Sequence, residues 1–252
     1  DDVESRGLGD VYKRQILMLI YLISIFMFYK IRYPDTAKNT LLPPLLTGSA
    51  LKWIALVTML TDHIGAVFLE NGVISAYNQQ LSSAWDFETT SFLYQADRIL
   101  RSVGRISFPI FCFLLVEGFV HTSNRKKYAL RLFLFACVSE LPFDLCFNGG
   151  LLEFSYQNVM FTLLIGFLTL WLMDIVRQKN PVLLLFTAGG GILLGKLFAA
   201  DYNLKGIVLI LILYLFYSYP LEKTIAGCLS LLWEPVACFA FLPINLYLSL
   251  IH

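Results

Sequence analysis

Long apolar runs recur along most of the chain, separated by short polar or Pro/Gly-containing breaks such as Asn180-Pro181. A helix that crosses a bilayer needs ~20 mostly apolar residues. The pattern therefore predicts about eight helical spans. We place them near residues 50–69, 99–121, 128–146, 158–176, 181–200, 204–219, 221–233 and 235–250.

Helices are favoured over the strands of a membrane barrel. The runs lack the period-2 alternation of apolar and polar residues that barrel strands require. Composition agrees, because 58% of the residues are hydrophobic, 15% are charged and the mean hydropathy is +0.69. A soluble domain carries about 25% charged residues. We predict an all-α, polytopic transmembrane helical bundle whose helices satisfy their own backbone polar groups.

The N-terminal segment differs from the rest of the chain. Residues 1–15 are polar and resemble a translated sequencing adaptor, so we interpret them as a non-native scar. Residues 16–46 contain an apolar run followed by Pro34, Pro43 and Pro44, which predict an extra helix and a linker.

Basic residues gather in alternate loops. Residues 70–97 and 147–157 contain none, and only Lys196 and Lys205 break the alternation. Lysine and arginine are enriched in cytoplasmic loops, so the span that begins near residue 50 is predicted to run from inside to outside. The residues that define the cytoplasmic side are Lys30, Arg32, Lys38 and Lys52, then Arg125, Lys126, Lys127 and Arg131, then Arg177 and Lys179, then Lys223.

Ionisable residues and one asparagine also fall inside the predicted spans, where ionisable groups are costly and usually functional. By the predicted topology, one set belongs to the outer half of the membrane: Asp62, His63, Arg101, Arg105, Glu140, Asp144 and Asn158. Glu117 and His121 belong to the cytoplasmic half. Polar groups near both faces suggest a route through the bundle, with one ligand arriving from each side.

Most of these groups also have a structural interpretation. Arg98 and Arg101 could reach the outer interface as snorkelling side chains. Arg105 could form a structural ion pair with Glu140, Asp144 or Asp62. The Arg125–Lys127 run could only set topology, and His121 could be an interfacial residue. His63 is the strongest functional candidate, because a neutral imidazole accepts a proton near neutral pH.

Several of these motifs occur in the order and spacing of a known family. They are LKWIALVTMLTDHIG, LRSVGRISFPIFCFLLVEGFVHTSNRKKYALRL, SELPFDLCFNG and QNVMFTLLIG, followed by ADYNLKGIVLILILYLFY. Together they resemble the TraX family over roughly residues 47–245. We accordingly take residues 47–252 as one TraX-like transmembrane domain. The sequence departs from the family at LPINLYLSLIH, where we expect the last helix to be missing.

The resemblance implies an activity. The founding activity of the family is acetylation of the N-terminal amine of conjugative pilin in the bacterial cytoplasmic (inner) membrane. A histidine at the end of the first apolar helix and a later arginine before FPIFCFLLVEGF also resemble membrane acyltransferases that use acyl-CoA. By this analogy His63 is the catalytic base, with Asp62 beside it, and Arg105 binds an anionic group or the developing oxyanion.

The remaining candidates follow from the same hypothesis, with acetyl-CoA as co-substrate. Arg125, Lys126 and Lys127 would meet the CoA phosphates, and Glu117 and His121 would line the cytoplasmic opening. Glu140, Asp144 and Asn158 would fix the arginine side chain or the acceptor amine. The expected substrate-binding set contains Glu117, His121, Arg101, Glu140, Asp144 and Asn158. The expected partners are the lipid bilayer, acyl-CoA and a pilin or other envelope acceptor.

Two non-enzymatic functions remain open at this stage. Polar residues at several depths would also suit a transporter, and a pilin-binding assembly partner would need no catalysis. The net charge of +1 gives no support to nucleic-acid binding. The five cysteines lack CxxC spacing, and we predict neither a disulfide nor a metal site.

Overall fold

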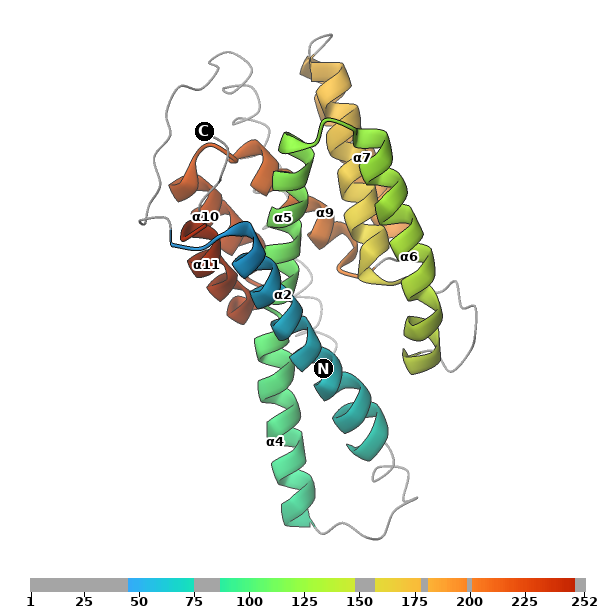
Figure 1. Ribbon diagram of the computed structural model, residues 1–252, viewed down its shortest axis with the longest axis vertical. Coiled ribbons are helices and arrows are strands. Elements are labelled where there is room, and N and C mark those ends of the chain that lie inside the picture. The colour runs from blue at the N-terminus through green and yellow to red at the C-terminus, as the bar shows by residue number, and fades with distance from the viewer. Residues whose placement is uncertain (1–44, 75–86, 148–156, 178–180, 199–200, 248–252) are drawn as a thin grey trace, which may run out of the picture.

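The computed structural model describes residues 45–74, 87–147, 157–177, 181–198 and 201–247 (Figure 1). Within these ranges the chain is helical, which confirms the predicted all-α class. The one extended pairing among them is an isolated parallel bridge between Leu46 and Tyr247. The interpretations of residues 1–15 and of the helix after them lie outside the described residues.

The first helical element is longer than a single α-helix. α2 (Gly48–His63) continues directly into the π-helix η1 (Ile64–Ile74). Thr47 caps α2, because its side-chain oxygen accepts a hydrogen bond from the Ala50 amide at 3.2 Å. Both parts pack against the next helix, α4, and this pair extends beyond the rest of the bundle at one end (Figure 1).

The predicted second span consists of two helices joined by a short turn. α4 (Phe87–Gly104) ends before Arg105, and α5 (Ser107–His121) begins two residues later. The Ser107 hydroxyl donates to the Gly104 carbonyl oxygen at 2.8 Å across this turn. Pro109 fits the first turn of α5, where its missing N–H leaves no helical bond unmade.

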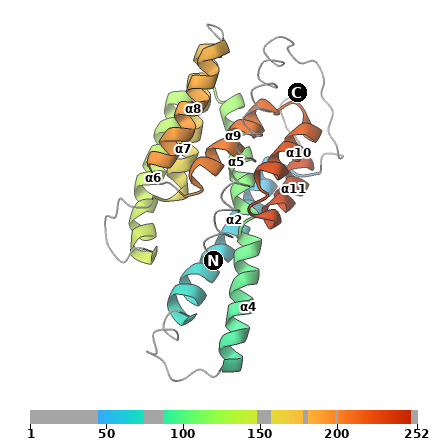
Figure 2. The ribbon, with the colours of Figure 1, turned by 180° about the vertical axis from the view of Figure 1, so that it is seen from behind.

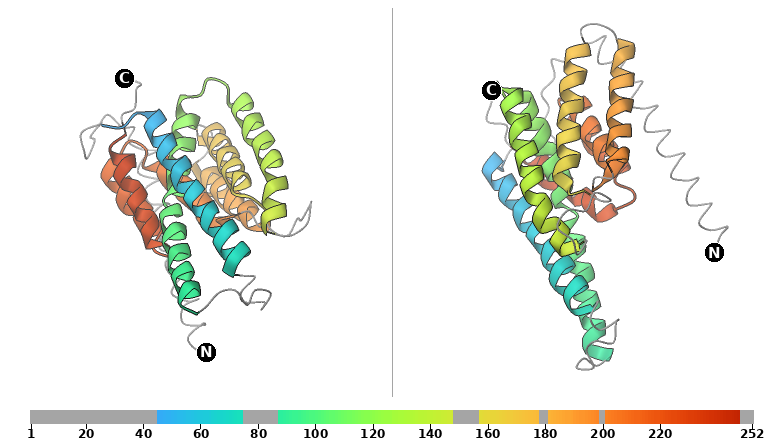
Figure 3. Two further views of the ribbon diagram at one scale, coloured as in Figure 1. Left: turned by 60° about the horizontal axis from the view of Figure 1, so that its bottom comes forward. Right: turned by 90° about the vertical axis from the view of Figure 1, so that its right-hand side faces the viewer.

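Three helices form one side of the molecule. α6 (Arg125–Phe147), α7 (Val159–Arg177) and α8 (Pro181–Leu197) lie side by side in the views of Figure 3. Their outer faces are strongly apolar; Phe135 is 65% and Phe186 is 72% exposed. Exposed apolar surface of this extent is typical of lipid contact.

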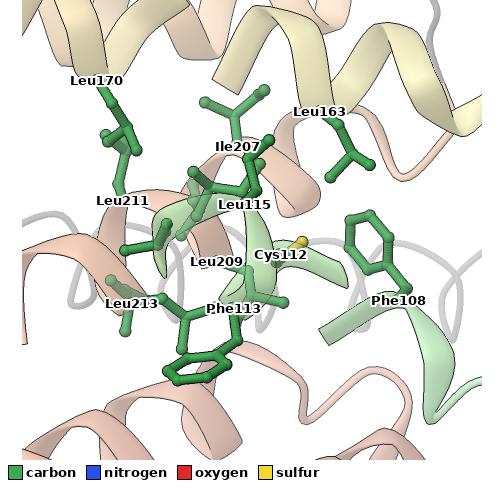
Figure 4. Close-up of a cluster of buried hydrophobic side chains, with 14 of the residues drawn as sticks. Phe108, Cys112, Phe113, Leu115, Leu163, Leu170, Ile207, Leu209, Leu211 and Leu213 are labelled. Atoms are coloured by element: carbon green, nitrogen blue, oxygen red, sulfur yellow. The ribbon is translucent and has the colours of Figure 1, made fainter. Parts of the chain in front are cut away.

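α9 (Asn203–Leu215) is the central helix, buried on all sides from Ile207 to Leu213. Figure 4 shows Ile207, Leu209 and Leu211 among side chains from α5 and α7, such as Leu115 and Leu170. A helix that is apolar all round belongs in a core. α9 therefore fixes how α5 and α7 sit relative to each other.

The last elements lie on the other side of α5 from α6–α8 (Figure 2). They are α10 (Pro220–Ser230), the 3₁₀-helix η2 (Pro235–Ala240) and the short helix α11 (Phe241–Asn245). Just after α11, the Leu246 carbonyl oxygen accepts from the amides of Leu45 and Leu46 at 2.8 Å each. The two ends of the described chain therefore meet beside the start of α2.

The structure supports a bundle of apolar helices, but it does not clearly confirm the predicted number of about eight spans. By length and composition, three described helices can cross a membrane: Gly48–Ile74, Ser91–His121 and Val159–Arg177. The helices Val182–Leu197, Asn203–Leu215 and Pro235–Asn245 are apolar but shorter. The last predicted span, 235–250, differs most, because a 3₁₀-helix and a five-residue helix replace a continuous helix.

Candidate functional site

Two polar clusters lie at opposite ends of α5. The Arg105 cluster comprises Asp62, Arg101, Arg105, Tyr202 and Glu234. The Glu117 cluster comprises Glu117, His121, Tyr217 and Tyr247. Glu117 follows Ser107 by ten residue steps, which correspond to ~15 Å of helix.

An ion pair joins α2 to α4 in the first cluster. Arg101 Nη1 lies 2.9 Å from Asp62 Oδ2, and Arg101 Nε lies 3.7 Å from Glu70 Oε2. Arg98, one turn earlier, is exposed. Arg98 and Arg101 therefore differ: Asp62 of the neighbouring helix holds Arg101, whereas the exposed Arg98 is still compatible with snorkelling.

Arg105 lies in the turn between α4 and α5 and takes its polar partners from the C-terminal half of the chain. Its Nη1 donates to the Tyr202 hydroxyl oxygen at 3.5 Å. Its Nε lies 3.9 Å from Glu234 Oε2. Neither partner was predicted from the sequence, which had suggested Glu140, Asp144 or Asp62.

Tyr202 is held in an unusual conformation just before α9. It has a backbone φ of 60°, and Asn203 has 44°, both in the left-handed region. Such residues cost of order 1–3 kcal/mol each and persist only where their surroundings hold them. The Tyr202 ring stacks on Phe108 with centroids 3.7 Å apart and meets the Trp233 ring edgewise at 5.8 Å.

The backbone of this segment is anchored to the start of α7. The Asp201 amide donates to the Gln157 carbonyl oxygen at 2.9 Å. The Thr162 hydroxyl donates to the Asp201 carbonyl oxygen. Burial raises the pKa of the Tyr202 phenol to about 12, so this hydroxyl is protonated at neutral pH.

His63 is exposed at the end of α2. Its Nδ1 lies 2.8 Å from the carbonyl oxygen of Met59 in its own helix. A carbonyl can only accept, so in the neutral ring Nδ1 carries the proton and Nε2 carries the lone pair. The neighbouring Asp62 pairs with Arg101 instead of orienting the imidazole, as adjacent helical residues point about 100° apart.

A separate buried group connects α6 to α7. Glu140 Oε2 accepts from the Asn158 amide at 3.2 Å and from the Asn158 side chain, which also donates to the Ala136 carbonyl oxygen at 3.0 Å. Asp144 is fully buried one turn beyond Glu140. Glu140 is connected to Arg105 indirectly. Glu140 holds Asn158, and the neighbouring Gln157 binds the backbone of Asp201, which precedes the Arg105 partner Tyr202.

The Glu117 cluster combines one buried carboxylate with three donors. Glu117 Oε2 accepts from the Tyr217 hydroxyl at 2.6 Å, and Oε1 accepts from the Tyr247 hydroxyl at 3.0 Å. His121 Nε2 lies 3.2 Å from Glu117 Oε1 and 3.1 Å from the Tyr217 oxygen. The predicted pair Glu117 and His121 is therefore in contact, and two tyrosines also bind the carboxylate.

The predicted phosphate-binding residues divide into two kinds. Arg125 Nη1 lies 2.6 Å from Asp174 Oδ2 of α7, and its guanidinium lies 4.6 Å from the centre of the Phe119 ring. Lys126 and Lys127 are exposed at the start of α6. Arg125 thus has a structural partner, while the two lysines present their charges to the surroundings.

Sequence reasoning missed Tyr202, Glu234, Tyr217 and Tyr247 as site residues. Only Tyr202 had a local signal, because it lies in the motif ADYNLKG that precedes a long apolar run. Tyrosines and a lone glutamate in apolar sequence resemble ordinary interfacial residues. Within the described ranges, no three histidine, cysteine or carboxylate residues gather as a metal site would require.

Comparison with known proteins places the chain in a family. Residues 47–248 match the family described as TraX protein. The chain is also similar to the Probable fimbrial assembly protein FimC, serogroup H1, of Dichelobacter nodosus, with 30% identity over 187 residues. That match covers 71% of this chain and 66%, just under two thirds, of the relative. No solved structure matches the chain significantly. With apolar helices and a family match over most of its length, the chain is a membrane protein that belongs to the TraX family.

Proposed function

We propose that the protein is a membrane-embedded acetyltransferase. It moves an acetyl group from acetyl-CoA to an amine or hydroxyl acceptor, and the N-terminal amine of a pilin is the acceptor that the family resemblance favours. The relative's name refers to fimbrial assembly, which supports a pilus-related role. The observation that carries the proposal is the imidazole of His63, whose Nε2 lone pair is exposed at the end of α2 where Asp62 joins the Arg105 cluster.

The chemistry assigns a role to two residues. The acceptor nitrogen or oxygen attacks the thioester carbonyl carbon, and its proton passes to His63 Nε2. Such general-base assistance contributes typically 10²–10⁴-fold. Arg105 stabilises the negative charge that develops on the carbonyl oxygen. The C–S bond then breaks, and the CoA thiolate takes the proton from His63.

The two substrates reach this site from opposite sides. The chain spans the bacterial inner membrane several times, with Lys126 and Lys127 at the cytoplasmic face. The phosphates of CoA bind near these lysines, and its pantetheine arm passes the Glu117 cluster along α5. The acceptor arrives from the outer side, where Asp62, Arg101 and Arg105 lie.

The test is thiol release from acetyl-CoA by purified protein in nanodiscs, with a pilin N-terminal peptide as acceptor. We expect His63→Ala and Arg105→Ala to lower turnover at least 10²-fold. Arg98→Ala is the matched control, because Arg98 is exposed on α4 and lies outside both clusters. Acetylation of the peptide is verified by mass spectrometry.

The outcomes separate the alternatives. If correctly inserted His63→Ala and Arg105→Ala proteins keep full activity, the assignment of these residues is wrong. If the wild-type protein neither binds nor turns over acetyl-CoA but retains the pilin peptide on a pull-down, the protein is an assembly partner. That second function is favoured by one observation, the fimbrial assembly name of the relative.

A further inference from the structure

We propose that Tyr202 is a third catalytic residue and the second oxyanion donor: its hydroxyl donates a hydrogen bond to the oxyanion of the acetyl-transfer intermediate. This inference rests on the proposed acetyltransferase function. It adds a residue from the start of α9 to the catalytic residues His63 and Arg105, which the sequence alone had suggested.

The first argument is the direction of the hydrogen bond to Arg105. The Arg105 guanidinium donates to the Tyr202 oxygen at 3.5 Å. This contact uses a lone pair of the phenol and leaves its O–H proton for another acceptor. A positive charge beside the phenol oxygen also polarises the O–H bond. The guanidinium and the phenol can therefore address the same anionic oxygen, as the two donors of an oxyanion hole do.

The second argument is that the position of Tyr202 is fixed from several sides. Phe108 supports one face of the ring in a stacked arrangement, and Trp233 contacts it edgewise. Gly206 allows this close packing, because a Cβ there would meet Phe108 at 2.9 Å and Tyr202 at 3.2 Å. Preorganised donors are effective because they need not reorganise as charge develops.

The third argument concerns the left-handed backbone at Tyr202 and Asn203. Asparagine tolerates this region, but a tyrosine is disfavoured there, and such strain is concentrated at functional sites. The anchors of Asp201 on Gln157 and Thr162 impose this conformation. In this conformation the Tyr202 hydroxyl lies 3.5 Å from Arg105 Nη1.

The proposed step balances without a further reactant. As the acceptor attacks, the carbonyl π electrons move to oxygen, and the Arg105 N–H and the Tyr202 O–H both donate to this oxygen. Tyr202 keeps its proton throughout. When the electrons return and the C–S bond breaks, both hydrogen bonds weaken. The phenol is a donor at neutral pH, since burial holds its pKa near 12.

The experiment is steady-state thiol release by the full chain with Tyr202→Phe, which keeps the ring contacts and removes only the hydroxyl. We expect kcat to fall roughly 10²-fold, as for loss of one oxyanion donor, with KM for acetyl-CoA nearly unchanged. The matched control is Tyr128→Phe, because Tyr128 is a stacked aromatic residue of α6 outside both clusters. It should retain wild-type kcat.

The possible failures are distinguishable. An active wild type with an equally active Tyr202→Phe overturns this inference and leaves the proposed function standing. An inactive wild type overturns both. Two other results assign Tyr202 a structural role and also overturn the inference. One is a fall in kcat that the loss of folded protein fully explains, and the other is a rise in KM with kcat unchanged.

A second variant tests the hydroxyl proton itself. Replacing Tyr202 with a ring-fluorinated tyrosine lowers the phenol pKa without changing the ring contacts greatly. If the protonated phenol donates to the oxyanion, the alkaline limb of the kcat profile moves to lower pH. An unchanged alkaline limb would contradict the proposed role.

Discussion

Close contacts between small groups of residues decide the geometry at the Arg105 end of the protein. Gly104 lies where α4 crosses α2, and a Cβ built on it would lie 2.2 Å from the Asp62 Cβ. The missing side chain lets Asp62 reach Arg101 at 2.9 Å. Small residues at helix crossings serve this purpose in membrane proteins, because they allow close backbone approach.

Gly104→Ala should therefore destabilise the protein and displace Asp62. We expect a loss of about 1–3 kcal/mol, typical of overpacking, measured as a lower unfolding temperature in detergent. Gly190→Ala is the control, because its Cβ would have no atom within 4 Å. That variant should be neutral or gain up to ~1 kcal/mol from helix propensity. Equal behaviour of the two variants would contradict the crossing geometry.

The ion pair between Asp62 and Arg101 makes a second prediction. Arg101→Ala leaves a half-buried carboxylate without its nearest cation, so we expect a loss of about 1–3 kcal/mol, between surface and buried pairs. Arg98→Ala should cost less than ~0.5 kcal/mol, because Arg98 is exposed. In a double-mutant cycle, Asp62→Ala with Arg101→Ala should lose less stability than the two single variants added together. Strict additivity would show that the pair is not coupled.

At the scale of elements, hydrogen bonds attach the segment before α9, which carries Tyr202, to the start of α7. Thr162 of α7 and Gln157 before it hold the backbone of Asp201, and Asn158 in turn is held by Glu140 of α6. Buried polar groups must find partners in an apolar bundle, since an unpaired group costs several kcal/mol. Hydrogen bonds thus connect Glu140 and Asn158 to the segment that carries Tyr202, and we expect both residues to position Tyr202 beside Arg105.

Thr162→Val should loosen this connection without disturbing the helices. The loss of one buried hydrogen bond costs about 1 kcal/mol net, and thiol release should fall several-fold more than stability alone explains. Thr187→Val is the matched control, because the Thr187 hydroxyl donates only within its own helix, to the Leu184 carbonyl oxygen at 2.9 Å. Circular dichroism checks helix content. Unchanged turnover in Thr162→Val would separate this connection from catalysis.

At the scale of the whole molecule, the length of α4 and α5 together sets the depth of the site. From Ser91 to His121, α4, the turn and α5 comprise 31 residues, which correspond to ~46 Å at a helical rise of 1.5 Å per residue. The hydrocarbon core of a bilayer is only ~30 Å thick. If His121 lies at one interface, the first turns of α4 project beyond the other, and Arg101 and Arg105 lie near that interface.

Cysteine accessibility in intact bacterial cells tests this arrangement. Gln95→Cys should react with a membrane-impermeant maleimide added outside, whereas Lys126→Cys should react only after the inner membrane is opened. Both positions are exposed. The chain with its five native cysteines gives the background. Labelling of both variants from the same side would contradict the predicted orientation.

Much of the helical pattern followed from the sequence alone. Apolar runs gave α6, α7 and α8 nearly their observed limits, because long apolar helices satisfy their backbone regardless of neighbours. The turn at Arg105 and the 3₁₀-helix η2 were not predicted. Local breakers such as Gly104, Pro109 and Pro235 lie at both places, but whether they end a helix depends on packing against other elements.

The sequence by itself determined that this is a helical membrane protein and that His63, Arg105 and Glu117 are unusual within it. Those conclusions depend on the cost of charge in an apolar segment, which is a local property. Only the tertiary structure decided that Arg105 meets Tyr202 and Glu234, and that Glu117 meets Tyr217 and Tyr247. These partners lie 97 to 130 residues away along the chain, and helix packing, which no local pattern encodes, brings them together.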